Sequence, residues 1–369
     1  MQTHALALDR PTAPAPTPPK LWKPRKVLIT AAARDWAHGR AIAERAASFG
    51  CDVVELSSNR LPRPEAEDPR RAYVEAKNTL AIVVAPPSKL RFQPIPPSAD
   101  WRFDLAEGCP AHCQYCYLAG SLAGPPITRA YANLPEILGL LESHVGRGTI
   151  TSRQAERADE GTTFEASCYT DPLGIEHLTG SLAETIRHFG AWDAAVQLRF
   201  TTKFDAVEPL LVLPHGRRTR IRVSVNAAPA ARFEGGTAPV AARFSAMRMM
   251  ALAGYRIGLT VAPIMPVEGW LEAYRTLFAQ AAQALDGVPD PDLTVELITH
   301  RFTPGSKDVL TGWYPGTSLD MDEAKRSRKL TKFGSVKYVF PADRMKEMRA
   351  GLERMVAEEL PAARILYWT

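Results

Sequence analysis

Apolar and polar residues follow a regular pattern from residue 26 onwards. Short apolar runs typical of buried strands alternate with segments of helical spacing, in the order 26–33, 38–50, 52–58, 69–77 and 79–86. A strand-helix-strand-helix-strand order is typical of a small parallel sheet covered by helices. The sequence therefore predicts a small α/β domain over residues 26–88.

A longer series of strand-like runs follows in the middle of the chain. Six apolar runs are expected to be strands: 102–108, 162–168, 195–202, 220–227, 256–264 and 293–302. Five helical patterns separate them: 133–144, 177–189, 205–212, 239–253 and 269–285. Strands that are apolar on both faces and alternate with helices are typical of a parallel barrel. Six units rather than eight predict an incomplete (β/α)6 barrel over residues 89–303, with its chemistry at the carboxyl ends of the strands.

The two ends of the chain have a different character. Residues 1–25 are rich in Pro and Ala and cannot build a core, so we expect a disordered arm there. Residues 304–369 are expected to form a C-terminal extension, with a basic hairpin through 333–340 and a helix around 343–359. The sequence has no apolar run long enough for a membrane span and none like a signal peptide. We therefore expect a soluble, cytoplasmic protein without membrane contact.

Composition narrows the function classes only slightly. A hydrophobic content of 46% with 23% charged residues is ordinary for a globular protein, and the net charge of +5 permits a nucleic-acid partner without requiring one. Five cysteines are an odd and sparse count. They argue against a secreted disulfide framework and for a metal or redox site in a reducing compartment.

Three of the cysteines lie together in the stretch LAEGCPAHCQYCYLAG, with the spacing C-x3-C-x2-C. They are Cys109, Cys113 and Cys116, in the loop after the first strand of the predicted barrel. A structural zinc ion needs four ligands, which His112 could complete, although it falls between two of the cysteines and no second cysteine pair exists. Three thiolates match a 4Fe–4S cluster with one iron left open to a small chelating ligand.

The cysteine spacing, with an aromatic residue before the last cysteine, resembles the cluster motif of the radical S-adenosylmethionine (SAM) enzymes. Most of residues 90–345 further resembles the spore photoproduct lyase family, in the order and spacing of five stretches. These are GCPAHCQYCYLAGSLAG, RAYANLPEIL, FEASCYTDPLGIEHLTGSL, RFTTKFDAVEPLL and HRFTPGS…FGSVKYVFP. The resemblance implies a lyase with a 4Fe–4S cluster and SAM as cofactors. Its substrate would be a UV lesion of DNA in which a methylene bridge joins two thymines.

The resemblance also implies roles for single residues in this reaction. The three clustered cysteines would ligate the cluster, and Cys168 would return a hydrogen atom to the thymine radical left when the bridge breaks. Tyr115 and Tyr117 would then relay a hydrogen atom, so that SAM is regenerated. From the residues alone, a small buried apolar side chain is the favoured interpretation of Cys168, and the tyrosines would usually pack around the cluster.

Four further residues match family positions close to SAM. Lys203 and Ser224 are expected to hold the SAM carboxylate, which suits a lysine at the end of a strand. Asp171 is expected to lie beside SAM, and Thr170 stands where the family pattern has a serine, which keeps the hydroxyl group.

The expected partners are lesion-bearing DNA and an electron donor such as flavodoxin or ferredoxin, and the sequence leaves the oligomeric state open. A lesion must leave the base stack to meet a radical held inside a protein. The basic hairpin, with Lys332, Lys337 and Tyr338, is expected to help open the duplex, since cations would hold phosphates while an aromatic side chain fills the gap.

Two other functions remain open at this point. One is a radical SAM enzyme that acts on another damaged base or another molecule. The other is a non-catalytic, metal-containing DNA-binding protein, which only the basic runs favour. The presence of Cys168, Tyr115 and Tyr117 favours the lyase, because an enzyme that consumes SAM as a co-substrate has no need of a return relay.

Overall fold

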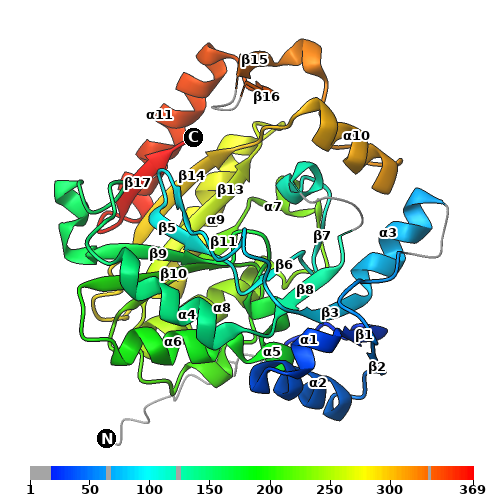
Figure 1. The fold of residues 1–369 in the computed structure, drawn as a ribbon. Coiled ribbons are helices and arrows are strands. Elements are labelled where there is room, and N and C mark those ends of the chain that lie inside the picture. The colour runs from blue at the N-terminus through cyan, green and yellow to red at the C-terminus, as the bar shows by residue number, and fades with distance from the viewer. Residues whose placement is uncertain (1–17, 64–67, 122–125, 331–333) are drawn as a thin grey trace, which may run out of the picture.

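The computed structural model describes residues 18–63, 68–121, 126–330 and 334–369. Figure 1 shows a large curved sheet through the body of the molecule and a smaller sheet at the blue, N-terminal end. Together they give an α/β architecture in which most neighbouring strands are parallel.

The smaller sheet has the strand order β2-β1-β3-β8-β6. Its strands are β1 (Lys26–Ile29), β2 (Val53–Glu55), β3 (Thr79–Val83), β6 (Ala106–Glu107) and β8 (Thr128–Tyr131), and its helices are α1 (Ala31–Arg34), α2 (Ala37–Ser48) and α3 (Pro69–Lys77). The three strands and two helices predicted before residue 88 are confirmed. β8 pairs with β3 in parallel, and β6 lies antiparallel to β8, so two strands from beyond residue 88 extend this sheet.

The larger sheet has the strand order β17-β14-β13-β11-β10-β9-β5-β4. The strands are β4 (Gln93–Ile95), β5 (Ala99–Phe103), β9 (Thr162–Ala166), β10 (Val196–Thr202), β11 (Thr219–Val225), β13 (Arg256–Ile264), β14 (Thr294–Thr299) and β17 (Arg364–Trp368). All neighbours are parallel except β4 and β5. The six predicted strands are all present in an open, curled sheet, which confirms the partial barrel. β17, from the last residues of the chain, extends it beside β14.

Helices connect these strands or pack beside them. They are α4 (Leu134–Leu141), α5 (Glu176–Thr179), α6 (Ser181–Ala191), α7 (Ala228–Ala231), α8 (Val240–Leu252), α9 (Trp270–Leu285) and α11 (Ala342–Glu359). The helix predicted over 205–212 was wrong, because only the short 3-10 turn Glu208–Leu210 forms there. Pro209 and Pro214 lack the amide hydrogen that a longer helix would need.

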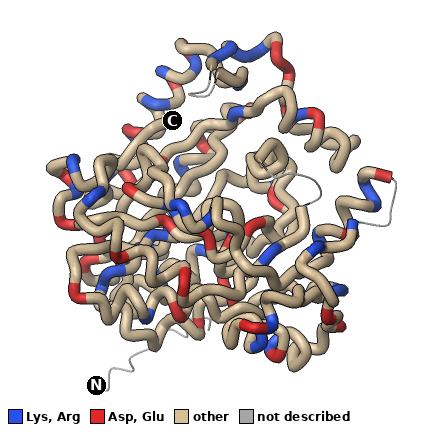
Figure 2. Tube along the Cα trace, viewed as in Figure 1, with Lys and Arg blue, Asp and Glu red and all other residues tan. Residues whose placement is uncertain are grey.

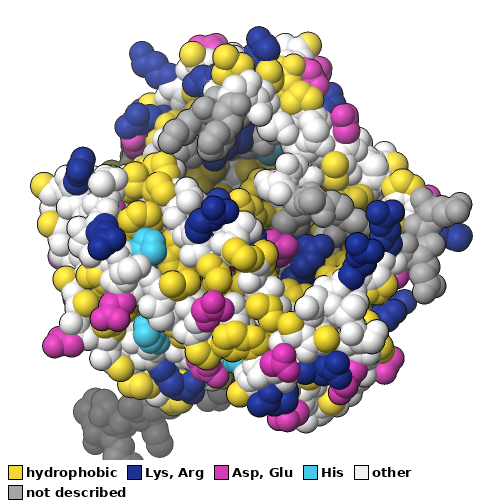
Figure 3. Space-filling view, in the orientation of Figure 1, with side chains coloured by type: hydrophobic (Ala, Val, Ile, Leu, Met, Phe, Trp, Pro, Cys, Tyr) yellow, Lys and Arg dark blue, Asp and Glu magenta, His cyan; other side chains and the backbone are white. Residues whose placement is uncertain are grey.

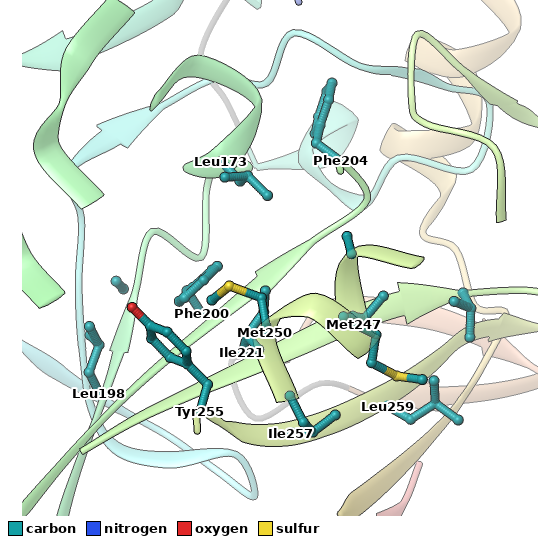
Figure 4. Close-up of a cluster of buried hydrophobic side chains, with 14 of the residues drawn as sticks. Leu173, Leu198, Phe200, Phe204, Ile221, Met247, Met250, Tyr255, Ile257 and Leu259 are labelled. Atoms are coloured by element: carbon teal, nitrogen blue, oxygen red, sulfur yellow. The ribbon is translucent and has the colours of Figure 1, made fainter. Parts of the chain in front are cut away.

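The apolar core lies between the strands and α8. Figure 4 shows Phe200 of β10, Ile221 of β11 and Leu259 of β13 beside Met247 and Met250 of the helix. All five side chains are fully buried. Each such side chain contributes roughly 1.5–3 kcal/mol relative to an exposed one. This packing fixes the strands whose ends carry the site.

The inner face of the same strands is ionic, which corrects the expectation that the strands are apolar on both faces. Arg199 and Arg222 point inward between apolar neighbours and are fully buried. Arg199 pairs with Glu296 at 2.5 Å, and Arg222 pairs with Glu296 at 2.9 Å and also with Glu165. Figure 2 shows Lys and Arg (blue) and Asp and Glu (red) interspersed along the trace. Buried charges need such partners, so one ionic network joins four strands.

The C-terminal part begins with α10 (Pro304–Trp313), whose first turn is capped reciprocally by Thr303 and Ser306. β15 (Ser327–Leu330) and β16 (Val336–Val339) pair antiparallel, which confirms a hairpin, although its first strand lies before residue 333. Figure 1 shows this hairpin at the top of the molecule. Across the described ranges, no helix combines the length and the apolar character that crossing a membrane requires.

Candidate active site

The three clustered cysteines lie in a loop that two distant elements hold in place. Cys113 belongs to the two-residue strand β7 (His112–Cys113), which pairs with β12 (Glu234–Gly235). Cys116 precedes the 3-10 helix Tyr117–Gly120. The ammonium group of Lys77, at the end of α3, donates to the carbonyl oxygens of Cys109 and Ala111. The loop is therefore held by α3 of the N-terminal part and by β12 of the barrel part.

All three cysteines line one cavity. The other lining residues are Tyr73, Lys77, Ala111, Leu118, Pro126, Trp313 and Tyr314. Burial raises the pKa of Cys109 to about 11, and burial raises the pKa of Cys113 further above its usual value. Both side chains are therefore neutral thiols near neutral pH, and bound iron would have to displace their protons.

The three thiols share one cavity, which bears on the kind of metal group that they could hold. Within the described part of the chain, no three His, Cys, Asp or Glu side chains are grouped so that they could hold one metal ion. A zinc ion needs its ligands to converge on one point. Each thiolate of a 4Fe–4S cluster holds a different iron, so three thiols that line one cavity fit such a cluster.

Cys168 lies at the rim, just after β9. Ser167 before it adopts a left-handed conformation with φ 60°, and its hydroxyl accepts a hydrogen bond from the Leu105 amide at 3.1 Å. The hydroxyl of Tyr117 donates to the carbonyl oxygen of Cys168. Burial, followed by the nearby carboxylates of Glu165 and Asp104, raises the pKa of Cys168 well above that of an ordinary thiol. Cys168 therefore keeps its S–H hydrogen at neutral pH.

Lys203 and Ser224 meet where β10 and β11 end. The Lys203 ammonium donates to the Ser224 hydroxyl at 2.9 Å, to Glu234 at 2.9 Å and to the Ala262 carbonyl at 3.3 Å. A lysine beside a hydroxyl group is a suitable donor pair for the carboxylate of an amino acid such as the SAM moiety. The two residues that the sequence assigned to the SAM carboxylate are thus adjacent in the structure.

Glu234 is the central residue of this corner, and sequence reasoning missed it. Its carboxylate accepts from Lys203 and from the Tyr115 hydroxyl, and it forms an ion pair with Arg243 at 2.6 Å. Lys203 and Arg243 lower the pKa of Glu234 against the opposing effect of burial. Its strand, β12, pairs with the strand of Cys113. The only sequence signal is a glutamate before two glycines, outside every predicted element.

Asp171 and Thr170, the other two residues expected near SAM, have different hydrogen-bonding environments. Buried Asp171 accepts from the Lys203 backbone amide at 2.7 Å and from the Thr202 hydroxyl at 2.8 Å, and burial raises its pKa to about 6. It therefore positions the residue that bears the ammonium group. The Thr170 hydroxyl is buried without a hydrogen-bond partner in the described structure, beside a small internal cavity lined by Leu105 and Ile175.

The two tyrosines of the expected relay have separate partners. Tyr115 is packed against the core and bonds Glu234, whereas Tyr117 is 66% exposed and bonds Cys168. Tyr117 therefore lies on the Cys168 side of the cysteine loop and Tyr115 on the side of Glu234 and Lys203.

The hairpin brings basic residues together away from this corner. Lys337 lies directly across from Lys329, and partial burial together with Arg301 and Lys329 lowers the Lys337 pKa. The ring of Tyr338 stacks on Phe302 at 5.4 Å between centroids. Lys332, the third residue predicted to contact DNA, lies outside the described residues.

Comparison with known proteins gives a consistent result. The family model "Spore photoproduct lyase" matches residues 22–369. The chain is 38% identical to spore photoproduct lyases of Geobacillus sp. (strain Y412MC61) and Bacillus subtilis (strain 168). These matches cover 95% and 94% of this chain and 100% and 98% of the relatives.

Solved structures of spore photoproduct lyase also match the fold. One is a complex with dinucleoside spore photoproduct, at a TM-score of 0.87 and 38% identity, and another is a mutant with bound AdoMet and the same dinucleoside, at 0.87 and 37%. Both comparisons cover 95% of this chain and 100% of the solved chain. The matches in sequence and in fold extend over nearly the whole chain, and this protein belongs to the spore photoproduct lyase family.

Proposed function

We propose that this protein is a radical SAM lyase that restores two thymines from spore photoproduct, two thymines joined through a methylene bridge, in DNA. The observation that carries the proposal is the hydrogen bond from the Tyr117 hydroxyl to the Cys168 carbonyl oxygen, which ties the cysteine loop to the residue that bears the thiol at the rim. A hydrogen-atom donor has to lie where the lesion meets the radical. The lesion is identified from a related spore photoproduct lyase, whose solved structure contains dinucleoside spore photoproduct.

The cofactors would be held by residues already described. Cys109, Cys113 and Cys116 would ligate a 4Fe–4S cluster, while Lys203 and Ser224 would hold the carboxylate of SAM. When bound, these two cofactors supply a 5′-deoxyadenosyl radical, which is the hydrogen abstractor that the reaction needs. Asp171, which accepts from the Lys203 backbone amide, would keep the backbone of Lys203 in place.

Cys168 would act on the lesion itself. Once the methylene bridge breaks, one thymine carries a carbon radical that must receive a hydrogen atom before solvent or reductant reaches it. An S–H bond is weak enough to provide that hydrogen, and the raised pKa of Cys168 keeps the hydrogen on sulfur. Tyr117, whose hydroxyl is next to the Cys168 backbone, would return a hydrogen atom to the resulting thiyl radical. The tyrosyl radical left on Tyr117 would recover a hydrogen atom through Tyr115 from 5′-deoxyadenosine, which allows SAM to be regenerated.

The substrate would be duplex DNA, and the hairpin would contact its phosphates. Lys329, Lys337 and Arg301 are close enough for their charges to oppose one another, which an anionic partner would relieve. We assign the protein to the cytoplasm, because all five cysteines are free thiols. Tyr338 would support the hairpin through its stacking on Phe302.

Anaerobic turnover tests this function. Protein reconstituted with iron and sulfide is incubated with SAM, dithionite and UV-irradiated DNA, and digested products are measured by liquid chromatography and mass spectrometry. Loss of spore photoproduct with matching gain of thymine is expected. Cleavage of SAM with the lesion left intact would contradict the assigned substrate, and a protein that does not cleave SAM would contradict the enzyme assignment.

A further inference from the structure

We propose that the outer face of α3 is the docking surface for a small, acidic, one-electron carrier protein that reduces the cluster. The proposal rests on the proposed function only in that the reaction needs an electron that this chain does not itself generate. The surface comprises Arg70, Arg71 and Val74 on the helix, together with Arg25 and Lys26 at the start of β1.

The surface is basic. These residues line a broad open depression, in which the four cations outnumber the carboxylates of Asp68 and Glu75. The Asp68 side chain already accepts the Arg71 backbone amide at 2.8 Å as the cap of α3. None of the four cations forms an ion pair with another residue of the described chain. Figure 3 shows dark-blue side chains gathered over the region of α3.

The composition of this surface suits a protein partner. Val74 is 47% exposed and lies one helical turn from both Arg70 and Arg71, so an apolar side chain is surrounded by guanidinium groups. Transient protein interfaces combine an apolar centre with a charged rim, and complementary charge accelerates the encounter of the partners.

The inner face of α3 belongs to the cluster site. Tyr73 lines the cysteine cavity and stacks on Trp313 with 4.6 Å between ring centroids. Buried Lys77 donates to the carbonyl oxygens of Cys109 and Ala111. One helix, about 10 Å across, therefore separates the basic surface from the loop that holds the cluster. An electron from a carrier bound at α3 would pass to the cluster through this helix and the hydrogen bond from Lys77 to the Cys109 carbonyl oxygen.

This position also leaves the substrate side free. Cys168 and the exposed Tyr117 mark the rim at which the lesion would enter, and Figure 1 shows the hairpin far from α3, with α10 between them. One electron passes from the reduced carrier to the cluster, so the carrier is oxidised by one electron and no proton or bond changes place. Closeness to the cysteine loop matters for this transfer and would be irrelevant to a DNA contact.

The test compares two double variants of the full-length reconstituted protein. Arg70→Glu/Arg71→Glu reverses the proposed surface, and acidic residues in the first turn of a helix favour folding. Lys346→Glu/Arg354→Glu on α11 changes the net charge equally at exposed positions far from α3. The probe is a purified acidic flavodoxin, reduced by one electron. Stopped-flow absorbance follows cluster reduction, and fluorescence anisotropy of labelled flavodoxin follows binding at low salt.

In the α3 variant, reduced flavodoxin is expected to reduce the cluster at least about tenfold more slowly and to bind more weakly. The α11 variant should match the wild type in both measurements. All three proteins should repair lesions equally with dithionite, which needs no docking surface. Equal rates of cluster reduction by flavodoxin in all three proteins would overturn the proposal. A loss of duplex DNA affinity in the α3 variant, with the rate of cluster reduction unchanged, would also overturn it. Failure of wild-type repair with dithionite would instead count against the proposed function.

Discussion

The corner around Glu234 and the basic hairpin present charge in opposite ways. At the corner, a buried carboxylate is matched by Lys203, Arg243 and Tyr115, so each charge has a partner inside the protein. At the hairpin, Lys329 and Lys337 lie directly opposite each other, and their like charges oppose one another. Under the proposed function, the corner would be preorganised for a small cofactor, whereas the hairpin would be completed by an anionic partner.

Removal of the Glu234 carboxylate should have the largest effect. Glu234→Ala leaves Arg243 and Lys203 without their counter-ion in a buried place, and breaking such a pair costs about 3–5 kcal/mol. The free energy of unfolding from urea denaturation of the cofactor-free protein measures this cost.

An exposed pair provides the matched control. Glu353 on α11 pairs with Arg349 at 2.7 Å, where both side chains are more than a third exposed. Glu353→Ala should cost less than about 1 kcal/mol. Equal losses for the two variants would show that the corner is no more preorganised than the surface.

Removal of hairpin charge should affect binding and not stability. Lys329→Ala and Lys337→Ala remove like charges that oppose each other, so the unfolding free energy should change little. The slope of log affinity for duplex DNA against log salt should fall by about 0.9 for each lost phosphate contact. Lys346→Ala on α11 is the control, and the hairpin has no role in DNA binding if all three variants keep the wild-type slope.

The smallest expected effect is a difference in how the alkylation rate of Cys168 depends on pH in the folded and in the unfolded protein. An ordinary thiol ionises near pH 8.5, but burial raises the pKa of Cys168, so its S–H form persists to higher pH. Alkylation by iodoacetamide requires the thiolate. Peptide mapping should show little increase at Cys168 between about pH 7 and 9 in the folded cofactor-free protein, and a steep increase in urea. A folded-state midpoint near about 8.5 would mean that the thiol is not protected from ionisation.

The sequence predicted the strands well because helices and strands alternate with clear spacing. It missed β17, which follows α11 at the end of the chain and joins the large sheet beside β14. It also missed the ionic inner face, because Arg199 and Arg222 each stand singly within apolar runs. Pairing between distant strands decides both features, and hydrophobic spacing does not record it.

The candidate site shows the same division between local and distant information. The cysteine triplet could be named from its spacing, whereas the family resemblance named Lys203 and Ser224, which the structure brings together. The role of Glu234 depends on a pairing with the strand of Cys113 across more than a hundred residues, which no local pattern reveals. The family resemblance supplied Cys168, since a lone cysteine after a strand has no distinctive spacing.

The central claim is that Cys168 gives its hydrogen atom to the thymine radical that remains after the methylene bridge of the lesion breaks. The most direct test is the amount of 5′-deoxyadenosine formed per thymine restored, measured for the wild type and Cys168→Ala with adducts identified by mass spectrometry. We expect little 5′-deoxyadenosine per repair in the wild type. In Cys168→Ala, hydrogen abstraction should continue while the product radical is diverted into solvent or dithionite adducts and SAM is consumed. Clean thymine at the wild-type ratio from Cys168→Ala would contradict the account.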